Sequence, residues 1–262
     1  MDLGFRGEVA DFYHAYRRGY PAAVIDVLAD TFGLDTHDVV IDLGCGTGQL
    51  TLPVARRVRA AVGVDPEPDM LLRARRAARD QGVANVSWIV GADSDMRSLG
   101  ALLGPRSVGA VTIGQALHWM NQDSLFPVLR PLARDGGGVA VVTNGTPLWL
   151  QDSAWSRALR GSLEQWLDAK LTRACGTDQE SQERYCDSLA RAGFDVLRTA
   201  VDYTGELDLD QIVGGIYSAL PVDHLPPANA RPAFAEQIRR AIGPQDRFTE
   251  HVHVAMLLGR SR

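Results

Sequence analysis

Three glycines at alternate positions follow a run of branched apolar residues in the stretch VVIDLGCGTGQL, residues 39–50. Glycine lacks the Cβ that would keep a ligand away, and the helix that follows offers free N–H groups, so the pattern is typical of a nucleotide site. The spacing of Gly44, Gly46 and Gly48 is G-x-G-x-G, which is shorter than the G-x-G-x-x-G of dinucleotide-binding folds. A pyrophosphate ligand is therefore disfavoured.

Acidic residues accompany three successive predicted strands. Asp42 stands just before the loop, where a carboxylate would repel a diphosphate but would suit a ligand that carries an ammonium group and a sulfonium charge. Asp65 ends the second strand, where an acid can accept both hydroxyls of a ribose. Asp93 follows the third strand, where its carboxylate can accept the exocyclic amine of adenine. A single Asp after a strand is more often a solvated turn residue, but three in succession indicate S-adenosylmethionine.

The elements that must position these residues alternate along the first half of the chain. Apolar residues at helical spacing predict two helices at the N-terminus, the first ending near Gly19 and the second opened by Pro21 and ended by Gly33. Five apolar strands with helical segments between them then run to residue 144. This order is typical of an α/β fold, a doubly wound and mostly parallel sheet with helices on both faces.

After residue 144 the pattern becomes mainly helical. Residues 146–190 and 208–242 are predicted to be helical insertions, each followed by a strand, and the stretch RFTEHVHVAMLLG closes the chain as the last strand. We expect a single domain over residues 1–262. Within it, residues 1–33 would supply N-terminal helices to the cap and the cofactor site, and the two insertions would form a lid over the substrate.

Four stretches, VIDLGCGTGQL, AVGVDPEPDML, GADSDM and IGQALHWM, resemble the successive motifs of class I S-adenosylmethionine-dependent methyltransferases, and in particular the small-molecule group called type 11. The resemblance covers about residues 8–145. It implies a seven-stranded sheet of order 3-2-1-4-5-7-6 with the last strand antiparallel. The motifs are specific to the cofactor and leave the acceptor open.

The resemblance also implies the contacts to S-adenosylmethionine. The loop from Gly44 to Gly48 would lie under the methionine portion, Asp65 would hold the ribose and Met70 would pack against adenine. The remaining residues expected at the cofactor site are Tyr13, Arg17, Asp42, Cys45, Pro66, Asp93, Ser94 and Gln115.

The opening stretch YHAYRRGYP resembles a Tyr, Tyr-Arg, Tyr-Pro pattern of the same family. Tyr13 or Arg17 would close over the methionine carboxylate, the arginine by a bidentate pair. The alternative is an amphipathic helix whose polar residues are simply exposed.

His118 is the candidate catalytic residue, because it follows the fourth strand at the expected switch point of the sheet. A sulfonium methyl is already activated, so transfer mainly requires an acceptor in line with the S–methyl bond. A hydroxyl acceptor would be helped by a base, and a neutral imidazole suits that role near pH 7. The alternative is that His118 only packs and bonds the backbone. His251 and His253 share one face of the last strand, but no third ligand is evident, so we expect no metal.

Composition narrows the choice of partners. The net charge of -5 disfavours a large phosphate-binding surface, and the fourth strand lacks the Pro-Pro-aromatic element that grips a flipped base. No apolar stretch of membrane-spanning length or signal-peptide pattern appears, so we expect a cytoplasmic protein without a membrane partner, acting as a monomer or homodimer. The expected function is methylation of a small organic acceptor in secondary metabolism. The alternatives are a non-catalytic or regulatory S-adenosylmethionine-binding protein and, less favoured, a nucleic-acid methyltransferase.

Overall fold

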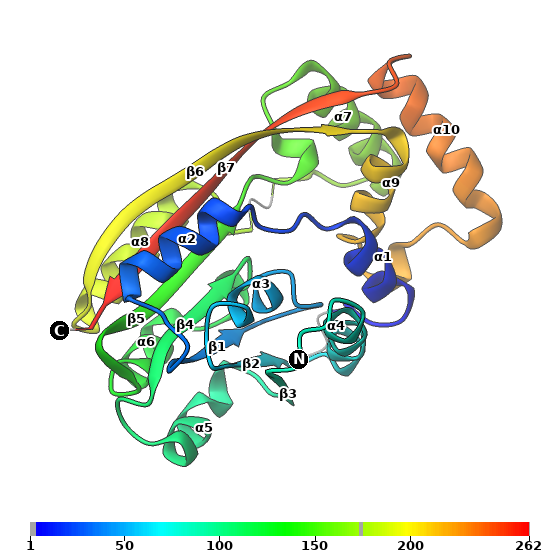
Figure 1. The fold of residues 1–262 in the computed structure, drawn as a ribbon. Helices are drawn as coiled ribbons and strands as arrows, with labels where there is room; N and C mark the ends of the chain where they lie inside the picture. Colours follow the sequence, from blue (N-terminus) through cyan, green and yellow to red (C-terminus); the bar gives the residue numbers. More distant parts are fainter. Residues whose placement is uncertain (1–3, 173–174, 262) are drawn as a thin grey trace. The chain divides into compact units, whose positions relative to one another are not determined.

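The computed structural model describes residues 4–172 and 175–261, and these fall into two compact units (Figure 1). One unit takes its residues from Met1–Arg17, Gly145–Cys175 and Asp202–His253, and we call it the helical unit. The other takes its residues from Arg18–Asn144, Gly176–Val201 and Val254–Arg262, and we call it the sheet unit.

The seven strands form one sheet of order β3-β2-β1-β4-β5-β7-β6, which confirms the predicted order. Their bounds are β1 Val39–Leu43, β2 Ala60–Asp65, β3 Val86–Val90, β4 Val108–Gly114, β5 Ala133–Asn144, β6 Asp195–Leu207 and β7 Phe248–Arg260. The pairs from β3 to β5 are parallel, and β7 is antiparallel to β5. Strands β1 and β4 are buried along nearly their whole length, as parallel strands covered on both faces must be.

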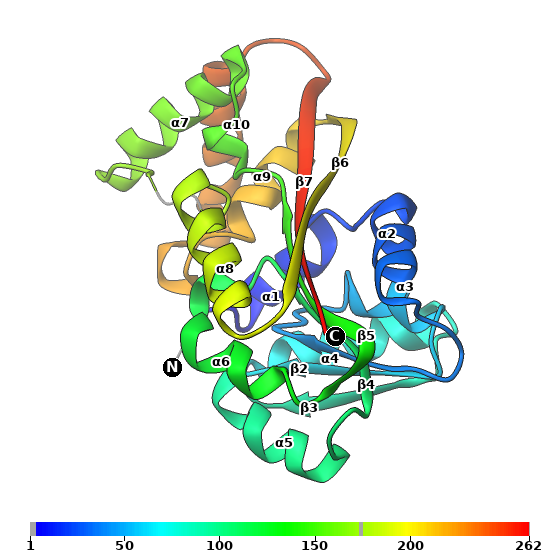
Figure 2. The same cartoon turned by 90° about the vertical axis from the view of Figure 1, so that its left-hand side faces the viewer.

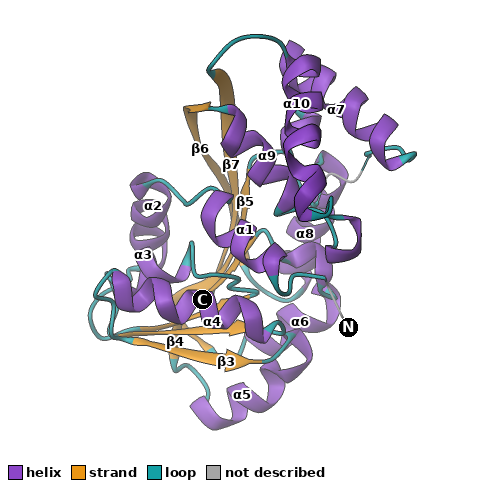
Figure 3. Cartoon of the chain, turned by 90° about the vertical axis from the view of Figure 1, so that its right-hand side faces the viewer, coloured by secondary structure: helices purple, strands orange, loops and turns teal. Residues whose placement is uncertain are grey.

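Helices cover both faces of the sheet unit (Figures 2 and 3). On one face, α3 and α4 pack on the strands through a cluster that includes Leu52 and Ala77. On the other, α5, α6 and α8 contribute Met96, Phe126 and Leu189 to a larger core. The helix bounds in this unit are α2 Ala22–Phe32, α3 Thr51–Ala55, α4 Pro68–Asp80, α5 Met96–Leu103, α6 Gln122–Leu129 and α8 Gln179–Arg191.

The helical unit has an apolar core of its own. It contains α1 Glu8–Tyr16, α7 Ala154–Leu167, α9 Leu209–Tyr217 and α10 Arg231–Ile242, together with the outer residues of β6 and β7. Large buried side chains such as Trp155, Ile212 and Phe234 form the core. Helix α1 packs closely on α9, because a Cβ added at Gly214 would lie 2.3 Å from the ring of Tyr16.

The segment expected to form the first insertion is divided between the two units. Its part from Gly176 onward belongs to the sheet unit, because Tyr185 and Leu189 on α8 pack in the core of the sheet. The first helix also ends earlier than the expected Gly19, since Arg17 already has an extended backbone. The described residues also form five short 3-10 helices, at Asp93–Asp95, Leu117–Trp119, Leu148–Leu150, Val222–His224 and Ala228–Ala230. Among the described residues, no helix is both long enough and apolar enough to cross a membrane.

Candidate functional site

The glycine loop is fastened to the end of β2. The N–H groups of Gly44 and Cys45 both donate to the carbonyl oxygen of Val64, at 2.8 and 3.0 Å. Gly44 has a φ of 71°, and a Cβ at this position would lie 2.4 Å from the Cβ of Ala116 beyond β4. The loop therefore requires glycine for its backbone angle and for its close approach to the segment that follows β4.

Asp65 holds the loop from the carboxyl end of β2. Its carboxylate accepts hydrogen bonds from the backbone N–H of Gly46, at 2.8 Å, and of Glu67, at 2.9 Å. Only 7% of the residue is exposed. Burial raises the pKa of Asp65 to about 6, although both hydrogen bonds favour the ionised form. The predicted ribose acid is thus already oriented by the backbone of the glycine loop.

Asp42 lies deeper, at the base of the same loop. Its carboxylate accepts hydrogen bonds from the hydroxyl of Thr51, at 2.5 Å, and from that of Thr112, at 2.7 Å. Burial raises the pKa of Asp42 to about 6, although the hydrogen bonds from the two hydroxyls lower it. These contacts tie β1 to α3 and β4. The expectation that Asp42 faces the charge of the ligand stays a prediction.

Sequence reasoning missed the two threonines that hold Asp42. Thr112 is the register partner of Asp42 on β4, and both are fully enclosed between the layers. A signal was available, since Thr112 is a polar residue in the otherwise apolar run VGAVTI. A buried hydroxyl needs a partner, and a parallel neighbouring strand can supply one.

Cys45 and Trp88 fill the space beside the loop. A Cβ at Gly63 would lie 2.5 Å from the Trp88 ring and 3.0 Å from the sulfur of Cys45, so this glycine leaves room for both. Burial, reinforced by the charges of Asp42 and Asp65, raises the pKa of the Cys45 thiol. Cys45 is therefore suited to filling space and unsuited to acting as a nucleophile.

The segment beyond β4 brings several predicted residues to one end of the sheet. Gln115 has a φ of 52°, unusual for a residue with a side chain, and its N–H donates to Val142. His118 follows in a 3-10 helix, half-buried, with its ring 5.0 Å from that of Trp119. The N–H of Asn121 then donates to Asp93, at 3.2 Å. The structure thus links the end of β3 to the segment that carries His118.

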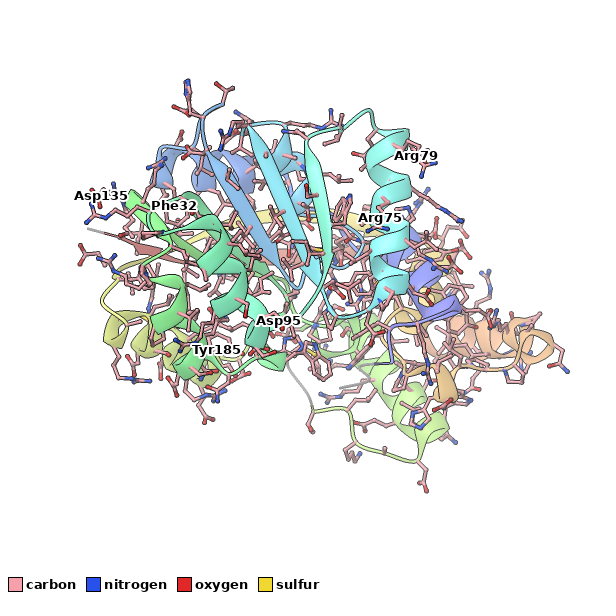
Figure 4. The ribbon with its side chains drawn as sticks, turned by 90° about the horizontal axis from the view of Figure 1, so that it is seen from below. Phe32, Arg75, Arg79, Asp95, Asp135 and Tyr185 are labelled. Carbon is pink, nitrogen blue, oxygen red and sulfur yellow. The ribbon has the colours of Figure 1, made fainter. Side chains whose placement is uncertain are left out.

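The remaining predicted cofactor residues of the sheet unit lie after β2 and β3. Met70 on α4 is buried, Pro66 is half-buried and Ser94 is exposed. Asp95, labelled in Figure 4, accepts a hydrogen bond from the N–H of Ala92 and closes the turn in which Ser94 lies.

Tyr13 and Arg17 belong to the helical unit, whereas the other predicted site residues belong to the sheet unit. The Arg17 guanidinium lies 5.0 Å from the centre of the Tyr13 ring and donates to the carbonyl oxygen of Ser218. Their contact with the cofactor stays a prediction.

Two further histidines that were considered as metal ligands have other partners. His253 lies 2.6 Å from Asp202, and His251 lies 3.2 Å from Thr204, across the paired ends of β6 and β7. Among the described residues, no group of three or more potential metal ligands gathers.

The glycine loop and the acids beside it lie in a stretch that is similar to a known protein family. Residues 40–137 match the sequence model of a family described as a methyltransferase domain. Residues 40–137 therefore carry a class I methyltransferase domain. The matched range contains the glycine loop, Asp65, Asp93 and His118. The class I expectation is confirmed, and the placement in the type 11 group stays a prediction.

Individual relatives match only part of the chain. An uncharacterised methyltransferase of Mycobacterium tuberculosis is 35% identical over 144 residues, which are 55% of this chain and 53% of that protein. A 23S rRNA (uracil-C5)-methyltransferase of Methylococcus capsulatus is 33% identical over 126 residues, 44% of this chain and 28% of that protein. The chain thus spans about half the length, or less, of these curated relatives.

A solved structure shares the fold over nearly the whole chain. It is a proposed type II methyltransferase from Anaeromyxobacter dehalogenans, with a TM-score of 0.66 and 21% sequence identity, and the match covers 94% of this chain and 98% of that one. The likeness therefore extends beyond the residues that the family model matches.

Replacing Gly44 by Ala tests the close approach in the loop. We expect Gly44→Ala to lower the free energy of unfolding by about 2–4 kcal/mol, the combined cost of a left-handed backbone and of overpacking against Ala116. The measurement is urea unfolding. Gly82→Ala is the matched control, because Gly82 has a φ of 66° but nothing within 4 Å of its added Cβ. Adding Ala116→Gly should recover part of the loss at Gly44. Equal losses at Gly44 and Gly82 would contradict the packing argument.

Proposed function

We propose that this chain transfers a methyl group from S-adenosylmethionine to a small organic acceptor. The observation that carries the proposal is the glycine loop held by buried Asp65. The loop follows β1, and the strand order reverses between β1 and its neighbour β4, which makes this the switch point of the sheet. The alternative is a non-catalytic protein that binds the same cofactor at the same site but does not transfer its methyl group. A mass-shift screen of phenols, sugars and carboxylic acids with S-adenosylmethionine separates the two, since turnover of none of them would favour the binding protein.

The residues present fit this cofactor. The hydroxyl oxygen of Thr47 in the loop is buried, and among the described residues it has no hydrogen-bond partner, as expected of a group that awaits a ligand. The glycine loop would lie against the methionine portion, Asp65 would accept the ribose hydroxyls, and Met70 with Asp93 would hold the adenine. Bound there, the cofactor supplies an activated methyl group, and the electrons of the broken C–S bond stay on sulfur.

His118 would act on the acceptor. If the acceptor is a hydroxyl, the imidazole takes its proton as the new C–O bond forms, so the oxygen attacks without building up positive charge. Its half-buried position on the segment after β4 supports this assignment. If the acceptor is a carboxylate or a neutral amine, no base is required, and His118 would contribute by position alone.

A small-molecule acceptor is favoured because the sheet unit lacks a sequence element that nucleic-acid methyltransferases often carry. The fourth strand continues as GQALHWM, without a Pro-Pro-aromatic element for a flipped base. The stretch similar to the ribosomal RNA enzyme spans 28% of that protein, so the similarity does not extend an RNA substrate to this chain. We therefore favour a small molecule of secondary metabolism, methylated in the cytoplasm by a monomer or homodimer.

We also propose that the helical unit selects the acceptor. Its core is rich in aromatic rings, with Phe12 and Tyr217 5.0 Å apart and Trp166 and Phe234 4.9 Å apart. Sites for apolar ligands are built mainly from hydrophobic and aromatic side chains, which this unit supplies. Helical segments that close over a reaction exclude water and orient the acceptor.

Deleting residues 1–17 tests this role of the helical unit, because the deletion removes α1 and leaves the sheet unit whole. We expect turnover of the acceptor found in the screen to fall, and the dissociation of bound S-adenosylhomocysteine to accelerate, with unchanged sheet content by circular dichroism. Full activity of the shortened protein would remove the helical unit from the mechanism.

The pH dependence of cofactor binding tests Asp65. Ribose hydroxyls donate to its ionised form, which is favoured only above a pKa of about 6, so affinity should rise with pH through that value. Calorimetry with S-adenosylhomocysteine should show about tenfold weaker binding at pH 5 than at pH 7.5. Asp65→Asn should weaken binding at pH 7.5 by about 1–3 kcal/mol and flatten the profile. An unchanged affinity, or tighter binding of NAD, would place the ribose contact elsewhere.

Substituting His118 tests the base. With a hydroxyl acceptor, turnover should rise with pH through an imidazole titration, and His118→Ala should lower it by about 10²- to 10⁴-fold with nearly unchanged cofactor affinity. Parallel pH profiles of similar height for the two proteins would reject the base and leave proximity as the mechanism. A loss of cofactor binding would instead make His118 structural.

A further inference from the structure

Strand β3 lies at one edge of the sheet, and it is bordered by an exposed surface in which apolar and basic side chains alternate. We call this the β3 edge surface. Its apolar members are Val90, 58% exposed, and Leu72, 43%. Its basic members, all on α4, are Arg75, Arg76 and Arg79. Figure 4 shows Arg75 and Arg79 along the helix that flanks this strand.

The members on α4 form one stripe of the helix. Residues 72, 75, 76 and 79 follow the spacing of a single helical face, while Ala74, Ala77 and Ala78 are buried against the sheet. Arg75 reaches the strand itself and donates to the carbonyl oxygen of Trp88, at 3.4 Å. Within residues 4–172 and 175–261, neither Arg76 nor Arg79 forms an ion pair, so their charges are available to a partner.

The backbone of β3 also offers hydrogen bonds outward. The carbonyl of Asn85 and the N–H of Gly91 bond β2, and in a parallel strand the direction of these groups alternates from residue to residue. Val86, Trp88 and Val90 therefore direct their N–H and C=O groups away from β2. Exposed strand edges pair readily with other chains, and proteins that avoid this usually keep apolar residues away from them.

We propose that an extended acidic segment of a partner protein adds to β3 as an eighth strand. Its backbone would pair with the outward groups of β3 and take the place of Arg75 at the Trp88 carbonyl. Its carboxylates would meet the arginines of α4, and its apolar side chains would cover Leu72 and Val90. Charge complementarity selects this occupant. Seven of the chain's 27 Lys and Arg residues lie between residues 56 and 79, in a protein of net charge -5.

Two other occupants are less suited to the β3 edge surface. A second copy of this chain joined by a two-fold axis would bring the three arginines against their own copies, and like charges repel. Single-stranded nucleic acid usually stacks its bases on aromatic rings, and the five residues of this surface include none. An acidic peptide satisfies the charge, the apolar contacts and the open strand edge together.

Fluorescence anisotropy with short labelled peptides tests the proposal on the full chain. The probe is a peptide of alternating Glu and Val. One matched probe has Lys in place of Glu, and the other has the Glu/Val sequence with backbone N-methyl groups that block strand pairing. We expect the full chain to bind the Glu/Val peptide, more weakly at high salt, and to bind neither matched probe.

Three protein variants separate charge from strand pairing. Arg75→Glu/Arg76→Glu/Arg79→Glu should weaken Glu/Val binding roughly tenfold or more and create binding of the Lys/Val peptide. Val90→Pro removes one outward N–H, which an edge strand tolerates, and should abolish binding while S-adenosylhomocysteine still binds. Arg239→Glu/Arg240→Glu on α10 is the control and should bind as the unaltered chain does.

Several results would overturn the proposal. One is no binding of the Glu/Val peptide, and another is binding that the arginine substitutions do not change. Equal binding of the N-methylated peptide would reduce the surface to a simple charge patch. Tighter binding of oligouridylate through the same arginines would identify a nucleic-acid surface. Self-association that the arginine substitutions abolish would identify an interface between copies.

Discussion

The backbone of the glycine loop and the carboxylate of Asp65 constrain each other, and the rest of the site depends on that constraint. Gly46 can donate to Asp65 because the loop turns back over the end of β2, and the turn uses positive φ angles at Gly44, Gly46 and Gly48 that favour glycine. The same turn brings Gly44 against Ala116, just before His118. The glycine loop thus lies directly against the segment proposed to carry the base.

The buried acids hold the glycine loop in place through hydrogen bonds within the protein. Asp42 anchors the end of β1 through threonines from α3 and β4, and Asp65 anchors the turn through backbone N–H groups. Burial raises the pKa values of Asp42 and Asp65 to about 6. The ionised carboxylates are therefore less favourable than in water, because burial removes their hydration. Ligand groups that donate to Asp65 would replace part of that hydration, which couples binding to its ionisation.

The sheet was largely predictable because parallel strands buried on both faces form continuous apolar runs, and because Gly33 and Pro68 mark helix ends by their own backbone preferences. The division at residues 145 and 176 was not predictable. Helix α8 has the same amphipathic pattern as α7, and only its tertiary packing, through Leu189, assigns it to the sheet. Within the site, the acids were found from their position after strands. Thr51 and Thr112 were missed, because their roles depend on strand register and packing rather than on a motif. Gln115 was expected at the site, but its left-handed backbone follows from a turn that no motif indicates.

The environment of Cys45 also bears on how the protein withstands oxidants. Peroxides and alkylating reagents attack the thiolate, and here a thiolate would be a third negative charge beside two acids in a desolvated pocket. The residue is only 6% exposed, and its sulfur already faces the carbonyl oxygen of Gly46. The free thiol of Cys45 in the glycine loop is therefore expected to react slowly with oxidants. The chain can keep a small polarisable side chain where the backbone is most crowded without making its own activity sensitive to redox stress.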